Sequence, residues 1–173
     1  MATEEYRDLY DEHRKPLGRT AKRGNGSLNE GEFHVVVMIA TMDSHGRLLC
    51  TLRSPEKSSY PGVWELTAGS VLAGEDSVSA AVRELREETG ISAQPEELKL
   101  FGTVTEKNAF IDCYFLRRDV ELSEIVLQEG ETADARLVSK SEFENMIAQK
   151  KIAFPVARRY SELYPLLMQE GFI

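Results

Sequence analysis

The segment from residue 69 to residue 91 constrains this chain more than any other part of its sequence. It opens at Gly69, and beyond Asp76 nothing in it breaks a helix until Gly90. Asp76 suits the capping of the first helical amides, and Gly90 suits the end of the helix. The apolar positions have the spacing of one buried helical stripe: Val78, Val82, Leu85 and Thr89. The pattern predicts a helix enclosed by two loops.

Three glutamates share one side of this expected helix. Glu84 lies three residues before Glu87 and four residues before Glu88, so all three meet on one strip of surface. Crowded carboxylates repel one another, and folding alone seldom offsets that cost. A divalent cation bound among them would offset it, so the spacing suggests a metal site. The competing interpretation is a solvated charged face, the commonest meaning of Glu and Arg on a helix.

The whole segment decides between these interpretations. It fits the pattern G-x5-E-x7-R-E-U-x-E-E-x-G-U, where U is apolar, with no departure. The matching residues are Gly69, Glu75, Arg83, Glu84, Leu85, Glu87, Glu88, Gly90 and Ile91. If each of the seven fixed residues has a frequency of roughly 6%, chance agreement is on the order of one in 10⁹. This pattern is the Nudix box, and the chain resembles the Nudix hydrolase superfamily.

The resemblance implies a fold and a reaction. The fold is α/β: a Nudix α/β/α sandwich with a mixed β-sheet, in which the box forms a loop, a helix and a loop. The reaction is hydrolysis of a diphosphate linked to another moiety, with Mg²⁺ as cofactor and Mn²⁺ as the alternative. Mg²⁺ prefers oxygen ligands and usually keeps waters and substrate phosphates. Metal-activated water attacks phosphorus, and the cation neutralises charge on the phosphoryl oxygens.

The resemblance also assigns roles residue by residue. The implied metal ligands are Glu84, Glu87, Glu88 and the backbone carbonyl of Gly69. Glu75 and Arg83 form the implied supporting pair, in which Arg83 holds the acids of the box in place. A glutamate outside or at the end of the box often acts as the base in this family. Glu129 and Glu131 are the candidates here, and an acidic surface turn is an equally good interpretation of them.

The residues before the box resemble the branch that includes type I isopentenyl-diphosphate isomerases. That likeness implies that Arg53 and Lys57 contact the substrate diphosphate, although solvated loop residues are the alternative. The isomerases need a cysteine soon after the tryptophan, together with metal-binding histidines, and residues 65–71 contain neither. His34 alone occupies an isomerase-like histidine position, and we expect it to be structural. Hydrolysis is therefore favoured over isomerisation and over a nucleotide-sensing module without turnover.

Length and composition set further bounds. The 173 residues suit a single Nudix domain over 1–173, with a hairpin and loop extension over 1–32. No membrane-spanning run or signal peptide is visible, so we expect a cytoplasmic protein without a membrane partner. Cys50 and Cys113 fit buried free thiols. The net charge of −8 argues against a nucleic-acid polymer as partner and favours a small diphosphate substrate bound through local basic groups.

The pattern of apolar and turn-forming residues predicts the remaining elements. We expect an N-terminal hairpin over residues 8–23 that turns at 15–18, followed by a loop over 24–32. Expected strands cover 34–41, 47–52, 64–67, 99–105, 110–117 and 132–138. Ser141 and Glu144 have capping-box spacing and predict the start of a helix, and 156–170 is the expected terminal helix. The identity of the substrate, the number of metal ions and the oligomeric state, including a homodimer, stay open.

Overall fold

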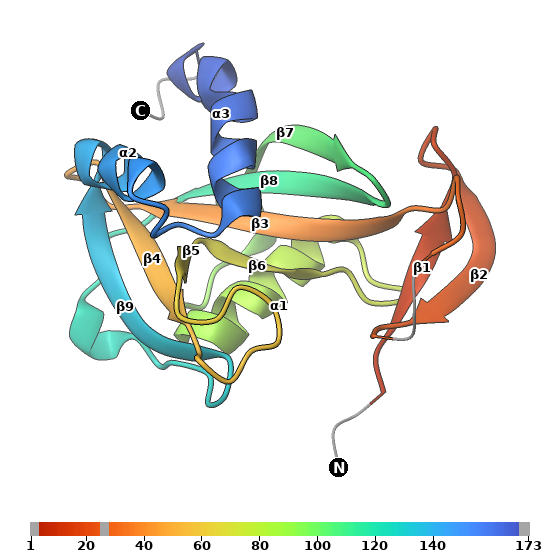
Figure 1. Ribbon diagram of the computed structural model, residues 1–173, viewed down its shortest axis with the longest axis horizontal. Coiled ribbons are helices and arrows are strands. Elements are labelled where there is room, and N and C mark those ends of the chain that lie inside the picture. The colour runs from red at the N-terminus through yellow and green to blue at the C-terminus, as the bar shows by residue number, and fades with distance from the viewer. Residues whose placement is uncertain (1–3, 25–27, 170–173) are drawn as a thin grey trace.

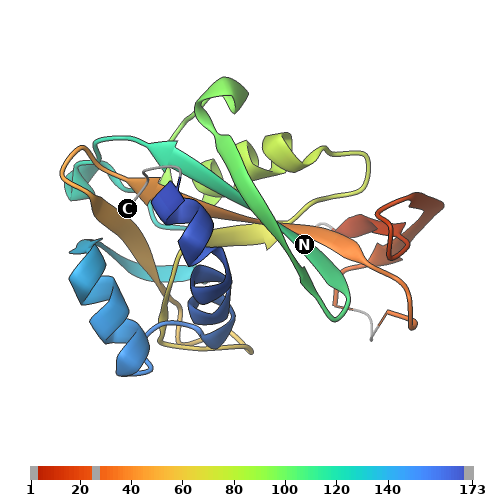
Figure 2. The same ribbon diagram turned by 90° about the horizontal axis from the view of Figure 1, so that it is seen from above.

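The computed structural model describes residues 4–24 and 28–169. A mixed β-sheet lies between helix α1 (Ser77–Thr89) on one face and helices α2 (Lys140–Ala148) and α3 (Phe154–Gln169) on the other (Figures 1 and 2). This arrangement confirms the expected α/β/α sandwich. Two short 3₁₀ turns, Pro95–Glu97 and Leu122–Glu124, complete the helical elements of the described residues. No helix in these two ranges is long and apolar enough to cross a membrane.

The sheet is built around β3 (His34–Met42), which pairs in parallel with β8 (Ala109–Arg117). On its other side β3 pairs with β6 (Thr67–Ser70) and, at Met42, with β4 (Arg47–Arg53). The outer strands are β5 (Trp64–Glu65), β7 (Lys99–Glu106) and β9 (Thr132–Ser139). The expected strand 64–67 is therefore two strands, because β5 pairs with β4 whereas β6 pairs with β3.

The two faces of β3 carry two separate cores. Val35, Val37 and Ile39 pack with Ala81 and Leu85 of α1. Met38, Ala40 and Met42 point the opposite way, into the core beneath α2 and α3. This burial on both faces explains the unbroken apolar run of β3. It also fixes α1 against the sheet through Leu85 and Thr89, while Val78 and Val82 of the expected stripe are only half-buried.

Capping groups define the helix ends. Asp76 accepts a hydrogen bond from the amide of Ser79, and Gly90 ends α1 with a left-handed φ of 76°, as expected. The predicted start of α2 was wrong, because the capping box is formed by Ser139 and Glu142 at the end of β9. Helix α3 begins at Phe154, before the predicted Val156. Pro155 therefore lies in the first turn of α3, where the N–H that proline lacks would have no helical acceptor.

The N-terminal hairpin, β1 (Tyr6–Tyr10) and β2 (Pro16–Lys22), forms its own sheet beside the sandwich (Figure 1). Its turn lies at residues 11–15, not at 15–18, because the Asp11 carboxylate accepts the amides of His13 and Lys15. Arg14, in a left-handed conformation, donates to both oxygens of Asp112, at 2.7 and 2.5 Å. Burial opposes ionisation of Asp112, but the hydrogen bonds from Arg14, Ser77 and Thr103 together outweigh burial and lower the Asp112 pKa. The hairpin is thus tied to the centre of the sheet.

His34, at the start of β3, provides a test of this packing. Burial, followed by the charge of Arg7, lowers the His34 pKa from 6.5 to about 4. Within the part of the chain that the structure describes, the Nδ1 atom of His34 has no hydrogen-bond partner. Below pH 6.5 the unfolded chain therefore binds a proton that the folded chain rejects. We predict that the stability advantage of the wild type over His34→Gln shrinks between pH 6.5 and pH 4, measured by urea unfolding at each pH. An advantage independent of pH would contradict this packing.

Candidate functional site

Helix α1 presents its three glutamates to a cleft, but not equally. Glu84 and Glu88 are each 8% exposed, whereas the Glu87 side chain is 40% exposed. The reason is that the sheet-facing stripe of α1 runs through Leu85 and Thr89, with Glu84 and Glu88 beside it and Glu87 farther round. Two of the three expected ligands are thus buried acids, and the third lies at the solvent edge.

Gly69 lies directly against Glu84. A Cβ atom at Gly69 would stand 1.9 Å from Cδ of the Glu84 carboxylate, closer than any real side chain allows. The glycine that opens the box is therefore required by space and not by its backbone torsions. Its absent side chain leaves a cradle in which the Glu84 carboxylate rests on strand β6. The structure thus brings Glu84 beside the backbone of the fourth expected metal ligand.

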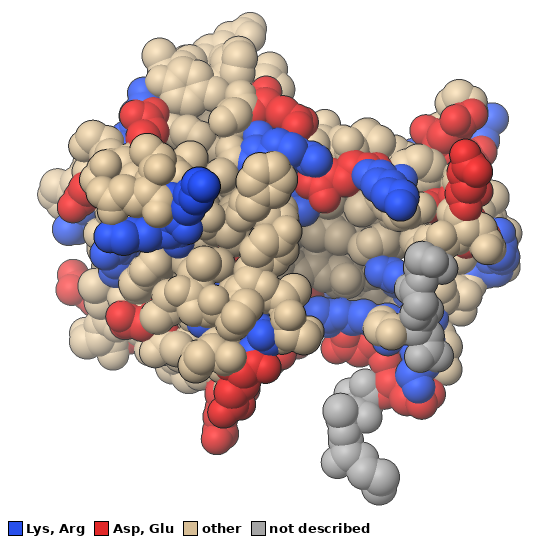
Figure 3. Space-filling view, viewed as in Figure 1, with Lys and Arg blue, Asp and Glu red and all other residues tan. Residues whose placement is uncertain are grey.

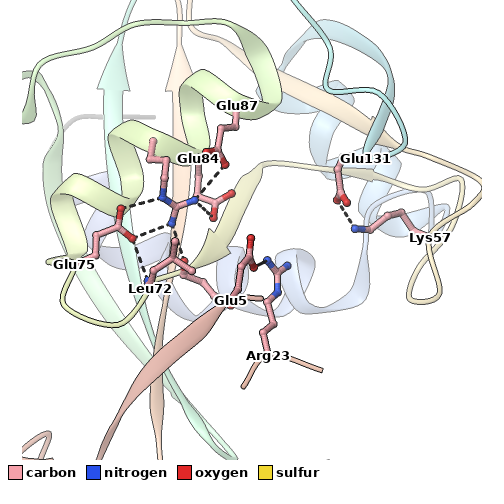
Figure 4. Close-up of polar contacts among 10 residues, drawn as sticks. Glu5, Arg23, Lys57, Leu72, Glu75, Glu84, Glu87 and Glu131 are labelled. Carbon is pink, nitrogen blue, oxygen red and sulfur yellow. Dashed lines mark hydrogen bonds and ion pairs between the residues drawn. The ribbon is translucent and has the colours of Figure 1, made fainter. Parts of the chain in front are cut away.

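Arg83 organises the acids of the box (Figure 4). It donates to both oxygens of Glu75, each at 2.9 Å, and to Glu84 at 2.8 Å and Glu87 at 3.2 Å. A further donation reaches the Ser70 carbonyl at 3.0 Å, and the amide of Leu72 donates to Glu75. The expected contact between Arg83 and Glu75 is present. It joins the loop before α1 to the helix face that carries the acids.

The buried acids are poised for a cation. Burial, reinforced by the charges of Glu65 and Glu84, raises the pKa of Glu88 well above its ordinary value. Burial also raises the pKa of Glu84, although Arg83 opposes it. The Oε2 atom of Glu88 is buried and has no hydrogen-bond partner among residues 4–24 and 28–169. A hard divalent cation fits these oxygen donors, since it would partner the orphaned oxygen and relieve the repulsion.

The acids are not already gathered as a ligand cluster. Over residues 4–24 and 28–169, no three Asp, Glu, His or Cys side chains converge at metal-binding distance. Arg83 accounts for this, because it draws Glu84 and Glu87 toward its own guanidinium. Coordination would require these two carboxylates to turn toward Glu88 while Glu75 retains Arg83.

A polar cleft of about 280 Å³ collects most of the predicted site residues: Arg53, Lys57, Glu84, Glu87, Glu88 and Glu131. The remaining predicted residues lie next to this lining. Gly69 and Arg83 contact Glu84, and Glu75 binds Arg83. The sequence reasoning assigned no role to several other lining residues: Glu5, Ser58, Ser59, Ala68 and Gln128. Arg23, at the end of the hairpin, lines the cleft as well. The signal for these residues was faint, because the loops and the hairpin that carry them are brought together only by the fold.

Arg53 has a buried partner that sequence reasoning missed. Its Nη1 donates to both carboxylate oxygens of Glu65, at 2.7 and 3.0 Å, and its Nε donates to the Ser59 carbonyl at 3.0 Å. The Arg53 side chain is 17% exposed and the Glu65 side chain is 10% exposed. Burial raises the pKa of Glu65, and Arg53 offsets part of that rise. A buried acid within a short strand needs such a partner, and this requirement is the signal that could have identified the pair.

Lys57 contacts Glu131 across the mouth of the cleft (Figure 4). The backbone supports this contact, since the Ser54 amide donates to the Glu131 carbonyl at 2.8 Å. Glu129, the other candidate base, is exposed and does not line the cleft. The geometry thus places only Glu131 of these two candidates beside the acids of the box.

Comparison with known proteins identifies the family. A family model described as NUDIX domain matches residues 32–162. An uncharacterised Nudix hydrolase of Listeria monocytogenes is 39% identical over 138 residues, which cover 79% of this chain and 81% of that protein. Isopentenyl-diphosphate delta-isomerase of Aspergillus fumigatus is 26% identical over 182 residues, 84% of this chain and 64% of the isomerase. The chain is thus also similar to an isopentenyl-diphosphate isomerase, at a lower sequence identity than to the Listeria protein.

A solved structure shares the fold. A protein of Deinococcus radiodurans superposes with a TM-score of 0.75 at 23% identity, covering 90% of this chain and 98% of that one. At this identity the likeness supports the fold alone, and it includes most of the sandwich described above.

The pair of Arg53 and Glu65 generates a prediction. Removing one partner of a buried ion pair costs about 3–5 kcal/mol, whereas replacing both by apolar groups is close to neutral. We predict that Arg53→Met lowers the free energy of unfolding by several kcal/mol and that adding Glu65→Leu restores most of it. The double variant should still show a raised KM for diphosphate substrates, measured beside the single variants. A wild-type KM in the double variant would mean that Arg53 acts only by holding its loop.

Proposed function

The chain belongs to the Nudix hydrolase family, and on this premise we propose that it is a Mg²⁺-dependent hydrolase that cleaves a diphosphate linkage in a small phosphorylated metabolite. The observation that carries the proposal is the pair of buried carboxylates, Glu84 and Glu88, facing a cleft lined by basic side chains. Buried acids with an orphaned oxygen are costly in a metal-free protein. Their cost is explained if the site binds a cation.

We propose that Glu84, Glu87, Glu88 and the Gly69 carbonyl hold the metal, with Mn²⁺ as an alternative to Mg²⁺. When bound, the cation would lower the pKa of water and neutralise charge on the phosphoryl oxygens. Arg83 holds Glu84 in the orientation that the Gly69 cradle permits, and Glu75 fixes Arg83 through two hydrogen bonds. Metal binding would turn Glu84 away from Arg83, and the pairing with Glu75 would keep Arg83 in place beside the site.

The basic residues act on the substrate. Arg53 at the end of β4 and Lys57 in the loop between β4 and β5 line the cleft together with the acids of α1. We assign them to the phosphate oxygens, where their charge offsets the net charge of −8 of the chain. A phosphate that engages Lys57 would release Glu131 from its ion pair. Glu131 could then accept a proton from the attacking water, which makes it the preferred base.

The isomerase alternative needs a reactive cysteine, and the structure offers neither Cys50 nor Cys113 for that purpose. Both are 0% exposed, lie outside the cleft, and have pKa values raised by burial to about 12. A thiol with such a pKa is protonated near neutral pH and is a poor nucleophile. Both are free, which suits the reducing cytoplasm where we place the reaction. The intact acids of the box also favour turnover over a sensing module.

We predict that Glu88→Gln and Glu84→Gln each lower kcat by at least about two orders of magnitude at saturating Mg²⁺, because each removes a charged ligand. The assay is a panel of phosphorylated metabolites, scored by released phosphate and pyrophosphate. Glu129→Gln is the matched control, since Glu129 lies outside the cleft, and should keep the wild-type rate. Wild-type rates in both box variants would refute the metal assignment.

A further inference from the structure

The N-terminal hairpin turns one of its faces toward the sandwich. The Nε atom of Arg7 is buried, and the charge of Arg7 acts on His34 at the start of β3, so the Arg7 side chain faces the sandwich, as does Leu9, which is 3% exposed. Arg7 pairs with Ala21, so Arg23 lies diagonally beside Arg7 on this inward face. Two guanidinium groups therefore face the domain from neighbouring strands.

These two arginines differ in their partners. Arg23 forms an ion pair with Glu5 at 2.6 Å, and both residues line the cleft below α1 (Figure 4). Arg7 is half-buried, and across the described ranges 4–24 and 28–169 it has no ion pair; its Nε is buried without a hydrogen-bond partner. Burial lowers the pKa of Arg7, and the neighbouring charge of Arg23 lowers it further. Arg7 is thus a desolvated cation held beside another cation.

A second unpartnered nitrogen adjoins this pair. The buried Nδ1 of His34 also lacks a partner, and the charges of Arg7 and Arg23 both disfavour protonation of His34. Both basic and acidic side chains border the hollow between the sandwich and the hairpin (Figure 3). Like charges crowded with open donors carry a cost that a bound anion would remove. The arrangement is the positive counterpart of the acidic strip on α1.

We propose that Arg7 and Arg23 form an anion subsite that binds a phosphate group of the substrate beyond the scissile diphosphate. The inference rests on the proposed function, and it names the substrate class as metabolites with a chain of three phosphates. The acids of α1 and Arg23 line the same cleft, and Arg7 lies diagonally beside Arg23 on the hairpin, next to this lining. The acids would take the metal-bound diphosphate, and the two arginines would take the next phosphate.

The hairpin is built to hold this subsite in place. The Gly74 amide donates to the Asp8 carboxylate at 2.8 Å, and the Ala73 amide donates to the Tyr6 carbonyl at 2.8 Å. β1 is therefore fastened to the loop of the box that leads into α1. The ion pair of Arg14 with Asp112 fixes the opposite end of the hairpin. An arginine on such a support can position a phosphate relative to α1.

Equilibrium binding tests the subsite without turnover. At constant free Mg²⁺, calorimetry would compare inorganic tripolyphosphate with pyrophosphate as probes. We expect the wild type to bind tripolyphosphate about tenfold more tightly, and Arg7→Gln and Arg23→Gln to bind the two probes almost equally. Arg7→Lys should keep part of the preference. Lys15→Gln, an identical loss of charge at the exposed turn of the same hairpin, should keep all of it.

Thermal unfolding separates binding from a structural role. Arg7→Gln should leave the ligand-free Tm unchanged or higher, because it removes a repelled cation. A preference for tripolyphosphate that survives in both Arg7→Gln and Arg23→Gln would overturn the subsite, even if the enzyme hydrolyses diphosphates as proposed. Conversely, if no metabolite is hydrolysed but Arg7→Gln abolishes the preference, the subsite stands and the proposed function fails.

Discussion

Repulsion between the buried carboxylates of Glu84 and Glu88 is the constraint on which the rest of the site depends. The sheet buries α1 through Leu85 and Thr89, and this placement draws both acids out of water. The missing side chain of Gly69 leaves room for the Glu84 carboxylate, and the Arg83 guanidinium forms an ion pair with it. Arg83 compensates only part of the charge, because one oxygen of Glu88 keeps no partner. A divalent cation would supply the positive charge that these carboxylates still lack.

Uncompensated positive charge lies on the hairpin, where Arg7 and Arg23 are close together and Arg7 has no acidic partner among the described residues. Arg23 acts electrostatically on Glu84, but its ion pair is with Glu5. A metal-bound polyphosphate would satisfy the acids of α1 and these arginines at once. Substrate binding and electrostatic relief are then the same event, and the ion pair of Arg14 with the buried Asp112 keeps the two charged surfaces at a fixed separation.

The sequence predicted local features well and long-range partners poorly. Asp76 and Gly90 could be assigned as helix ends because capping chemistry acts over a few residues, and the apolar run at 34–41 identified a buried strand. The partner of Arg53 could not be assigned, since Glu65 meets it only through the pairing of β4 with β5. The role of Arg7 was invisible for the same reason. The helix cap at Ser139 was misplaced by two residues because Ser141 and Glu144 have the same spacing.

The most direct test of the central claim is titration of the intact protein with Mn²⁺, followed by electron paramagnetic resonance of the free ion, with and without pyrophosphate. The buried acids of α1 should bind Mn²⁺, so the free-ion signal should stay low until the site is filled, and excess Mg²⁺ should restore it by competition. A free-ion signal that rises in step with added Mn²⁺ under both conditions would show that these carboxylates hold no cation, and would contradict the account.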